Sequence, residues 1–118
     1  MKFLCLAYGS EEDWKDLSKS EQDELLAQDA VLRKAGALMA AVMPSVTCVK
    51  AWEGTPETAH TPFAAAPVPL AGFSIIEADN IEDVVQLVAS TPCARAGGAI
   101  EIRPIRQMND FVLTTPES

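Results

Sequence analysis

His60 is the only histidine in this sequence, and histidine is the side chain best suited to carry a proton near neutral pH. It stands in a proline-rich stretch, residues 55–71, that predicts a rigid loop, because each proline fixes φ and removes a backbone donor. A catalytic histidine normally needs a neighbouring group that orients its ring, and the sequence identifies none for His60. Two interpretations stay open: His60 is a general acid–base group, or it is an exposed loop residue without a chemical role.

A polar pair, Glu101 and Arg103, lies two residues apart where a strand would place both side chains on one face. The pair forms either a structural ion pair or the polar wall of a pocket. A carboxylate beside an arginine stays ionised, which suits anchoring a ligand better than moving a proton. Aromatic side chains would supply the apolar part of such a pocket. The ligand-binding candidates are Tyr8, Trp14, Phe63, Glu101 and Arg103.

We expect neither a metal site nor a cofactor site. The acidic residues between Asp13 and Glu24 are spread around a helix axis without the spacing of a calcium loop, which predicts a solvated face. Gly97 and Gly98 precede a strand rather than a helix, and they therefore predict a turn instead of a phosphate-binding loop. The cysteines are odd in number and widely spaced, which predicts reduced thiols rather than disulfides or zinc ligands. They are Cys5, Cys48 and Cys93.

The composition excludes several classes of protein. A chain of 118 residues with 48% hydrophobic and 22% charged residues is typical of one globular domain. The formal net charge of −8, without a cluster of lysine or arginine, argues against binding to nucleic acid or to an anionic membrane surface. The apolar run at residues 3–7 is too short to span a bilayer and makes a poor signal peptide. We therefore expect a cytoplasmic protein.

Periodicity and capping signals predict the elements that must position these groups. Ser18 followed by Glu21 fits a capping box, Gly36 fits the end of the same helix, and Asn80 fits the start of a second helix. The expected helices span residues 19–35 and 81–91, with a short helical turn at 10–17. The expected strands span residues 2–8, 37–43, 46–52, 72–78 and 99–105.

The order of strand, helix, strands, helix and strand predicts a ferredoxin-like α+β fold with both helices on one face of the sheet. We expect a single domain over residues 1–105 and a C-terminal tail over residues 106–118. The first strand is apolar on both faces, so the face without helices must also be covered. A homodimer would cover it symmetrically. In the alternative, the proline-rich loop caps that face within one chain.

The segment from His60 to Phe73 reads His-Thr-Pro-Phe-Ala-Ala-Ala-Pro-Val-Pro-Leu-Ala-Gly-Phe. It resembles, without a gap, the signature loop of the DGPF branch of the YCII-related family. Its polar positions differ, because His60 replaces an aspartate, Ala65 and Val68 replace glutamates, and Pro67 replaces a lysine. The matching framework positions are Pro62, Phe63, Ala64, Leu70, Gly72 and Phe73. Further similarities to the family are residues 2–9 with Trp14, residues 35–36, and the ending Glu-Ile-Arg-Pro-Ile at 101–105.

This resemblance implies a ferredoxin-like domain that assembles as a dimeric α/β barrel. Because the usual aspartate, glutamate and lysine groups of the loop are absent, we expect binding of a small molecule or a protein partner, with little catalysis. The alternative is an enzyme on small organic molecules that uses His60 as the general acid–base group. In that alternative Glu101 or Arg103 would orient or neutralise the substrate.

Overall fold

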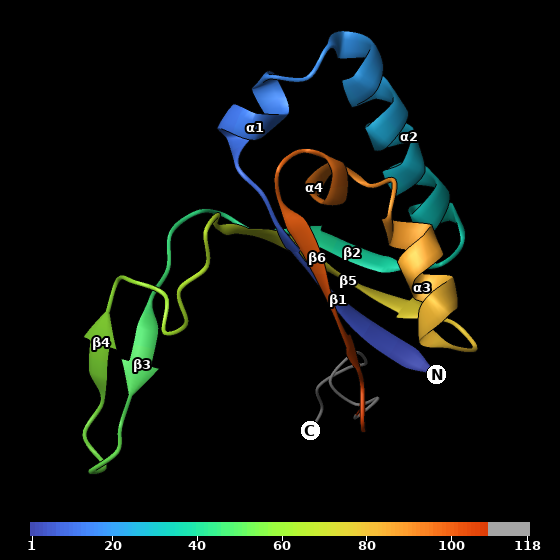
Figure 1. The fold of residues 1–118 in the computed structure, drawn as a ribbon. Coiled ribbons are helices and arrows are strands. Elements are labelled where there is room, and N and C mark those ends of the chain that lie inside the picture. The colour runs from blue at the N-terminus through green and yellow to red at the C-terminus, as the bar shows by residue number, and fades with distance from the viewer. Residues whose placement is uncertain (109–118) are drawn as a thin grey trace.

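The computed structural model describes residues 1–108, which form an antiparallel sheet with the helices on one face (Figure 1). The four strands lie side by side in the order β2-β5-β1-β6. Taken in chain order with α2 and α3 between them, they form the ferredoxin-like arrangement, and the expected fold class is confirmed. The strands are β1 (Lys2–Tyr8), β2 (Leu38–Ala41), β5 (Leu70–Glu77) and β6 (Ala99–Pro104). The helices are α1 (Glu11–Lys15), α2 (Lys19–Lys34), α3 (Ile81–Val88) and α4 (Pro92–Arg95).

Local side-chain bonds determine where the two long helices begin. The Ser18 hydroxyl accepts a hydrogen bond from the Glu21 amide at 3.1 Å, and the Glu21 carboxylate accepts one from the Ser18 amide at 2.9 Å. This is the predicted capping box at the start of α2. The Asn80 side chain likewise accepts a bond from the Asp83 amide at 2.9 Å and caps α3. At the other end of α2, Gly36 takes a positive φ of 101°, as a helix-terminating glycine does.

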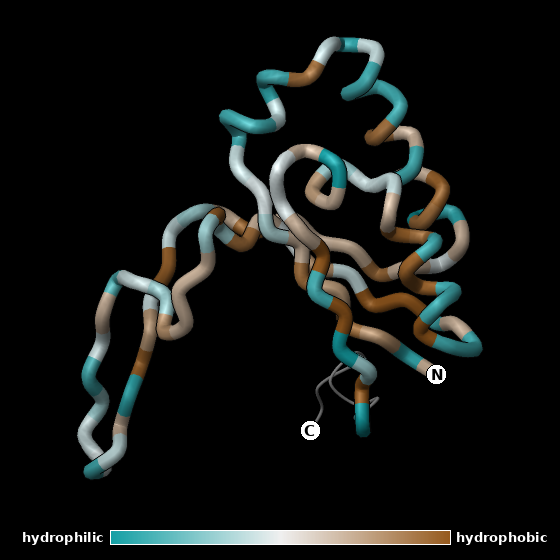
Figure 2. The backbone as a smooth tube through the Cα atoms, in the orientation of Figure 1, coloured by the Kyte–Doolittle hydropathy of each residue, from teal (hydrophilic) through white to brown (hydrophobic). Residues whose placement is uncertain are grey.

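The hydrophobic core lies between the sheet and the two long helices. Phe3 and Cys5 of β1 are 1% and 2% exposed, and Val84 of α3 is fully buried. Figure 2 shows the hydrophobic residues gathered in the strands of the sheet and on α3, while α2 alternates hydrophobic and hydrophilic residues along its length. The buried core cluster consists of Phe3, Cys5, Leu32, Ile76, Val84 and Val88.

No helix of residues 1–108 covers the opposite face of the sheet, which we call the open face (Figure 1). Strand register places Leu6 opposite Phe73 and Leu4 opposite Ile75 on this face. All four side chains are half-buried, and Leu38, beside Ile75 on the edge strand, is 48% exposed. An apolar surface of this kind on a sheet indicates an interaction face.

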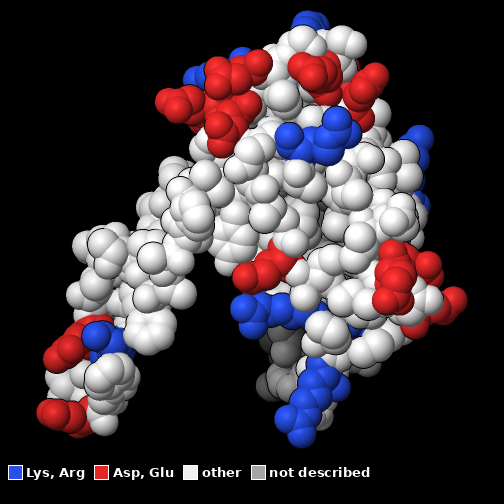
Figure 3. Space-filling view, in the orientation of Figure 1, with Lys and Arg blue, Asp and Glu red and all other residues white. Residues whose placement is uncertain are grey.

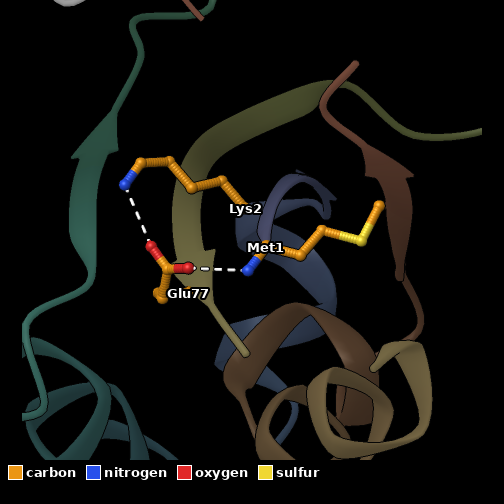
Figure 4. Close-up of polar contacts among 3 residues, drawn as sticks. All are labelled: Met1, Lys2 and Glu77. Carbon is orange, nitrogen blue, oxygen red and sulfur yellow. Dashed lines mark hydrogen bonds and ion pairs between the residues drawn. The ribbon is translucent and has the colours of Figure 1, made fainter. Parts of the chain in front are cut away.

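The N-terminal end of β1 is tied to the end of β5 by a three-residue ion cluster (Figure 4). The Met1 ammonium lies 2.7 Å from one oxygen of Glu77, and the Lys2 ammonium lies 3.0 Å from the other. Bonds from the N-terminal ammonium and from Lys2 hold the pKa of Glu77 at about 2. Because Lys2 and Glu77 are direct cross-strand partners, the cluster favours the observed register.

Residues 42–69, which we call the arm, leave the sheet and project away from the helices (Figure 1). The expected strand at 46–52 is shorter in the structure. It is reduced to β3 (Cys48–Lys50), which pairs only with β4 (Glu57–Ala59) inside the expected proline-rich loop. Because β2 pairs directly with β5, residues 42–69 form an excursion between two adjacent strands, and β3 pairs with β4 inside that excursion.

Several other boundaries differ from the sequence prediction. The expected helix over residues 81–91 ends at Val88, and Pro92 begins the separate short helix α4. Proline is favoured at a helix start, because the amide it lacks has no partner there. The expected strand at 37–43 is also shorter, at Leu38–Ala41. Most of the expected tail lies in residues 109–118, outside the described residues.

Candidate functional site

The main cavity lies between the helix-covered face of the sheet and the helices α2 and α4, and its volume is about 240 Å³. Small residues on the sheet leave this space open. Among them, Gly72 has the least room for a side chain. A Cβ at Gly72 would lie 2.5 Å from the carbonyl oxygen of Ala40, so any side chain there would push β2 away from β5. The small residues of the cavity wall are Ala7, Ala40, Ala41, Ala71, Gly72 and Ser74.

Asp29 of α2 is the acidic group of this otherwise mostly apolar wall. Burial raises the pKa of its carboxyl group, and the nearby Arg33, one turn later on α2, only partly offsets that effect. Within residues 1–108, no cation lies in ion-pair distance of Asp29 and no side-chain hydrogen bond reaches its carboxyl group. Asp29 can therefore accept a hydrogen bond from a bound hydroxyl or amino group, or accept its proton.

Two thiols also face the cavity. Burial raises the pKa of Cys93, and the negative charge of Asp29 raises it further. Burial likewise raises the pKa of Cys5, although a hydrogen bond from Ser74 opposes the shift. Since a free thiol titrates near pH 8.5, both groups stay protonated at neutral pH and are poor nucleophiles. All three cysteines are free.

The short helix α4 forms one wall of the cavity, and its position is set by Thr91 and Pro92. The buried Thr91 hydroxyl donates a hydrogen bond to the Val88 carbonyl at 2.6 Å and closes the end of α3. Pro92 then begins α4 directly above the sheet. Because the Thr91 proton is already used, the charged side chains of the wall that remain for a ligand are Asp29 and Arg33.

A second hollow of about 210 Å³ lies beside α1 and α4, and Trp14 lines it. Ser10 caps α1 by accepting a hydrogen bond from the Asp13 amide at 3.1 Å. The carbonyl of Trp14 accepts a bond from the Gln22 side chain at 2.9 Å, which ties α1 to α2. These bonds hold the half-buried indole at the wall of the hollow.

The structure does not bring the six sequence-predicted site residues together. His60 follows β4 on the arm and is exposed, and Phe63, also on the arm, is 77% exposed. Glu101 and Arg103 form an exposed ion pair of 3.3 Å on the open face, and their strand neighbour Tyr8 points to that face as well. Of the six residues, Trp14 alone lines a cavity.

Asp29 was not predicted as a site residue, although its position in the helix indicated a role. Leu25 and Leu32 are the buried residues of α2, and Asp29 lies between them at helical spacing on the same side. A charged residue within the apolar stripe of a helix is unusual and marks a group that faces a cavity or a partner. The acidic residues around it concealed this signal.

Charge is unevenly distributed on the surface. Figure 3 shows acidic side chains gathered over α1 and α2 and near the tip of the arm, whereas the region where the arm joins the body is largely uncharged. No group of three metal-binding side chains occurs in the part of the chain that the structure describes. No helix among the described residues is long and apolar enough to cross a membrane.

Three comparisons with known proteins bear on this fold. A family model for the YCII-related domain matches residues 1–109. The solved structure of 5-chloro-2-hydroxyhydroquinone dehydrochlorinase (TftG) from Burkholderia phenoliruptrix AC1100, in complex with 2,5-dihydroxybenzoquinone, is similar at a TM-score of 0.53. That chain is 19% identical, and the match covers 92% of this chain and 96% of that chain. At this identity the similarity bears on the fold alone.

A divalent cation tolerance protein (Cut A1) from Thermus thermophilus matches at a TM-score of 0.33 and 17% identity, which is too remote to support an argument. That match covers 96% of this chain and 92% of the other. No curated protein sequence matches this chain.

Proposed function

The chain belongs to the YCII-related family, and we propose that it binds a small, mostly apolar organic molecule in the cavity between α2, α4 and the sheet. The observation that supports this proposal is Asp29, a desolvated carboxyl group without a protein partner in residues 1–108 on a largely apolar wall. Ligand sites are mostly apolar, with a few polar groups that orient the ligand. Asp29 is the orienting group of this site.

The chemistry of the wall restricts the ligand. Asp29 needs a hydrogen-bond donor, so the ligand carries a hydroxyl or amino group. Arg33 lines the same cavity and offsets part of the negative charge of Asp29, so the net charge of −8 is what disfavours an anion. A neutral or cationic ring compound meets these conditions. The structure of TftG with 2,5-dihydroxybenzoquinone supports placing hydroxylated rings first among the probes.

Binding can be tested by calorimetry with phenol and benzoate as a matched neutral and anionic pair. We expect phenol to bind more tightly than benzoate. Asp29→Asn should weaken phenol binding about tenfold or more, since a hydrogen bond to a charged group contributes about 1.5–3 kcal/mol. Asp23→Asn, an exposed acidic position of the same helix, should leave phenol binding unchanged. Equal affinity of Asp29→Asn and the parent would contradict the proposal.

A second candidate function is acid–base chemistry on the bound molecule, and the raised pKa of Asp29 favours it. A carboxyl group whose pKa moves toward neutrality is a better general base than an ordinary aspartate. His60 could join such a reaction only if a second copy of the chain brought its arm over this cavity, because His60 lines neither hollow of its own chain. Both thiols are protonated and suit binding rather than nucleophilic attack.

We also propose that the chain forms a homodimer through its open face. The apolar side chains Leu4, Leu6, Phe73 and Ile75 support this, as does the arm, which projects away from the helices (Figure 1). The radius of gyration is 16.3 Å, against about 13.5 Å for a compact chain of this length, so the arm extends well beyond the body. A symmetric partner would cover both surfaces.

Size-exclusion chromatography with light scattering tests this assembly. The parent protein should have the mass of a dimer, and Leu6→Glu on the open face should have the mass of a monomer. Leu26→Glu, at a 51% exposed position on α2, should remain a dimer. Circular dichroism checks that each variant is folded, and a monomeric parent would exclude the dimer.

The three free thiols are consistent with a reducing compartment, and we propose that the protein acts in the cytoplasm.

A further inference from the structure

The main cavity and the second hollow share three wall residues, Ala71, Pro92 and Cys93. We propose that the two form one elongated binding site, with Asp29 at one end and Trp14 at the other. Its ligand is then a two-ended molecule, with a hydroxyl or amino group at Asp29 and a flat aromatic ring at Trp14. This inference rests on the proposed function and specifies the class of ligand.

Size favours the joined site. Ligand pockets typically measure about 300–1,000 Å³. The main cavity, at about 240 Å³, and the hollow, at about 210 Å³, each lie below that range, whereas together they lie within it. A compact molecule would occupy one hollow, and an extended molecule would fill both.

The passage of the proposed site runs past Cys93, which lines both hollows and packs against Gly9. A Cβ at Gly9 would lie 3.0 Å from the sulfur of Cys93, closer than most side-chain contacts. The amide of Gly9 donates a hydrogen bond to the Pro69 carbonyl at 2.9 Å, so the backbone is held in this position. A side chain at residue 9 would therefore narrow the passage.

The Trp14 end of the site suits an aromatic ring. The indole is half-buried, and the backbone of Trp14 is fixed by the hydrogen bond that the Gln22 side chain donates to its carbonyl. Glu11 lines the same hollow and adds negative charge, so this end also disfavours an anion. Stacked or edge-to-face aromatic pairs contribute beyond the area they bury.

Calorimetry with phenol and 4-benzylphenol, a compact and an extended probe with the same hydroxyl group, tests the inference. We expect 4-benzylphenol to bind about tenfold more tightly than phenol, and Trp14→Leu to remove most of that difference while leaving phenol binding unchanged. Gly9→Ala should also weaken 4-benzylphenol selectively. If Gly9→Ala does not fold, Trp14→Leu carries the test, because Trp14 lines the second hollow and not the main cavity.

Intrinsic fluorescence provides a second measurement. Trp52 lies on the arm and is 82% exposed, so Trp52→Phe leaves Trp14 as the only tryptophan. In that variant, 4-benzylphenol should change the Trp14 emission and phenol should not.

The outcomes separate the two proposals. Phenol binding that depends on Asp29, with a 4-benzylphenol affinity unaffected by Trp14→Leu, would overturn the elongated site and leave the proposed function standing. Absence of binding by both probes would overturn both proposals.

Discussion

The body and the arm contain the same kinds of apolar residue in opposite environments. Phe3 in β1 is 1% exposed, whereas Phe63 on the arm is 77% exposed. Within the arm every residue is exposed except the half-buried Cys48 and Val68. Packing between the sheet and its helices, rather than side-chain hydrophobicity alone, therefore decides which residues form the core. The apolar groups of the arm are available to a partner surface.

The largest contrast is expected from truncating one phenylalanine in each region. Phe3→Ala should lower the free energy of unfolding by about 3–5 kcal/mol, because it leaves a cavity in the core. Phe63→Ala should change it by about 0.5 kcal/mol or less, as at other exposed positions. Urea unfolding at low protein concentration measures the change in the free energy of unfolding for both variants. A large loss in Phe63→Ala would show that a partner covers the arm.

Glycine substitutions should give the next largest contrast. A Cβ at Gly98 would overlap the Tyr8 carbonyl oxygen, so Gly98→Ala must separate β6 from β1 and should cost about 3 kcal/mol. Gly54 on the arm has a φ of 94° and no atom within 4 Å of its Cβ position. Gly54→Ala should therefore cost only the backbone strain, about 1 kcal/mol. Thermal unfolding compares the two variants. Equal decreases in Tm for Gly98→Ala and Gly54→Ala would contradict the close packing at Gly98.

The acidic groups of the body should respond to pH with opposite signs. The pKa of Asp29 is raised in the folded state above its ordinary value of 3.8. Its ionised form therefore lowers the free energy of unfolding at neutral pH. This loss disappears as the pH falls through the folded pKa toward 3.8. Asp29→Asn should therefore be more stable than the parent at pH 7, and the gain should vanish in acid. Urea unfolding across this pH range measures it. A gain that does not change with pH would contradict the desolvated carboxylate.

Glu77 should behave in the opposite way. Its folded pKa of about 2 lies below the ordinary value of 4.5, so its stabilisation is present above pH 4.5 and is lost as the pH falls toward 2. Glu77→Gln should be less stable than the parent at pH 7 and should lose less stability between pH 4.5 and 2. An NMR titration of the Glu77 side chain measures its folded-state pKa independently.

The smallest effect is expected from His60→Ala on the exposed arm. The free energy of unfolding should change by about 0.5 kcal/mol or less, and phenol affinity should stay unchanged, because His60 lines neither hollow. Asp29→Asn in the same calorimetric series is the positive control. A loss of phenol affinity in His60→Ala would show that the arm reaches a binding site.

The parts of the structure predicted correctly depend on neighbours in the chain. Ser18 with Glu21, Gly36 and Asn80 marked helix ends because capping bonds join residues three or four apart. The free cysteines and the Glu101–Arg103 ion pair also agree with the sequence analysis. Asp29 was missed because the acidic residues around it concealed its position between Leu25 and Leu32, and the cavity it faces depends on small sheet residues that are distant in sequence.

The helix caps, most of the strands, the ferredoxin-like order and the resemblance to the YCII-related family could all be predicted from the amino-acid sequence. Each of these depends on residue type, local spacing or short bonds. The folded chain was needed to show that residues 42–69 leave the sheet and that Asp29, Cys93 and Trp14 line adjoining hollows. Strand pairing and burial depend on contacts between segments that are distant in the sequence. A local sequence pattern does not show which distant segments will meet.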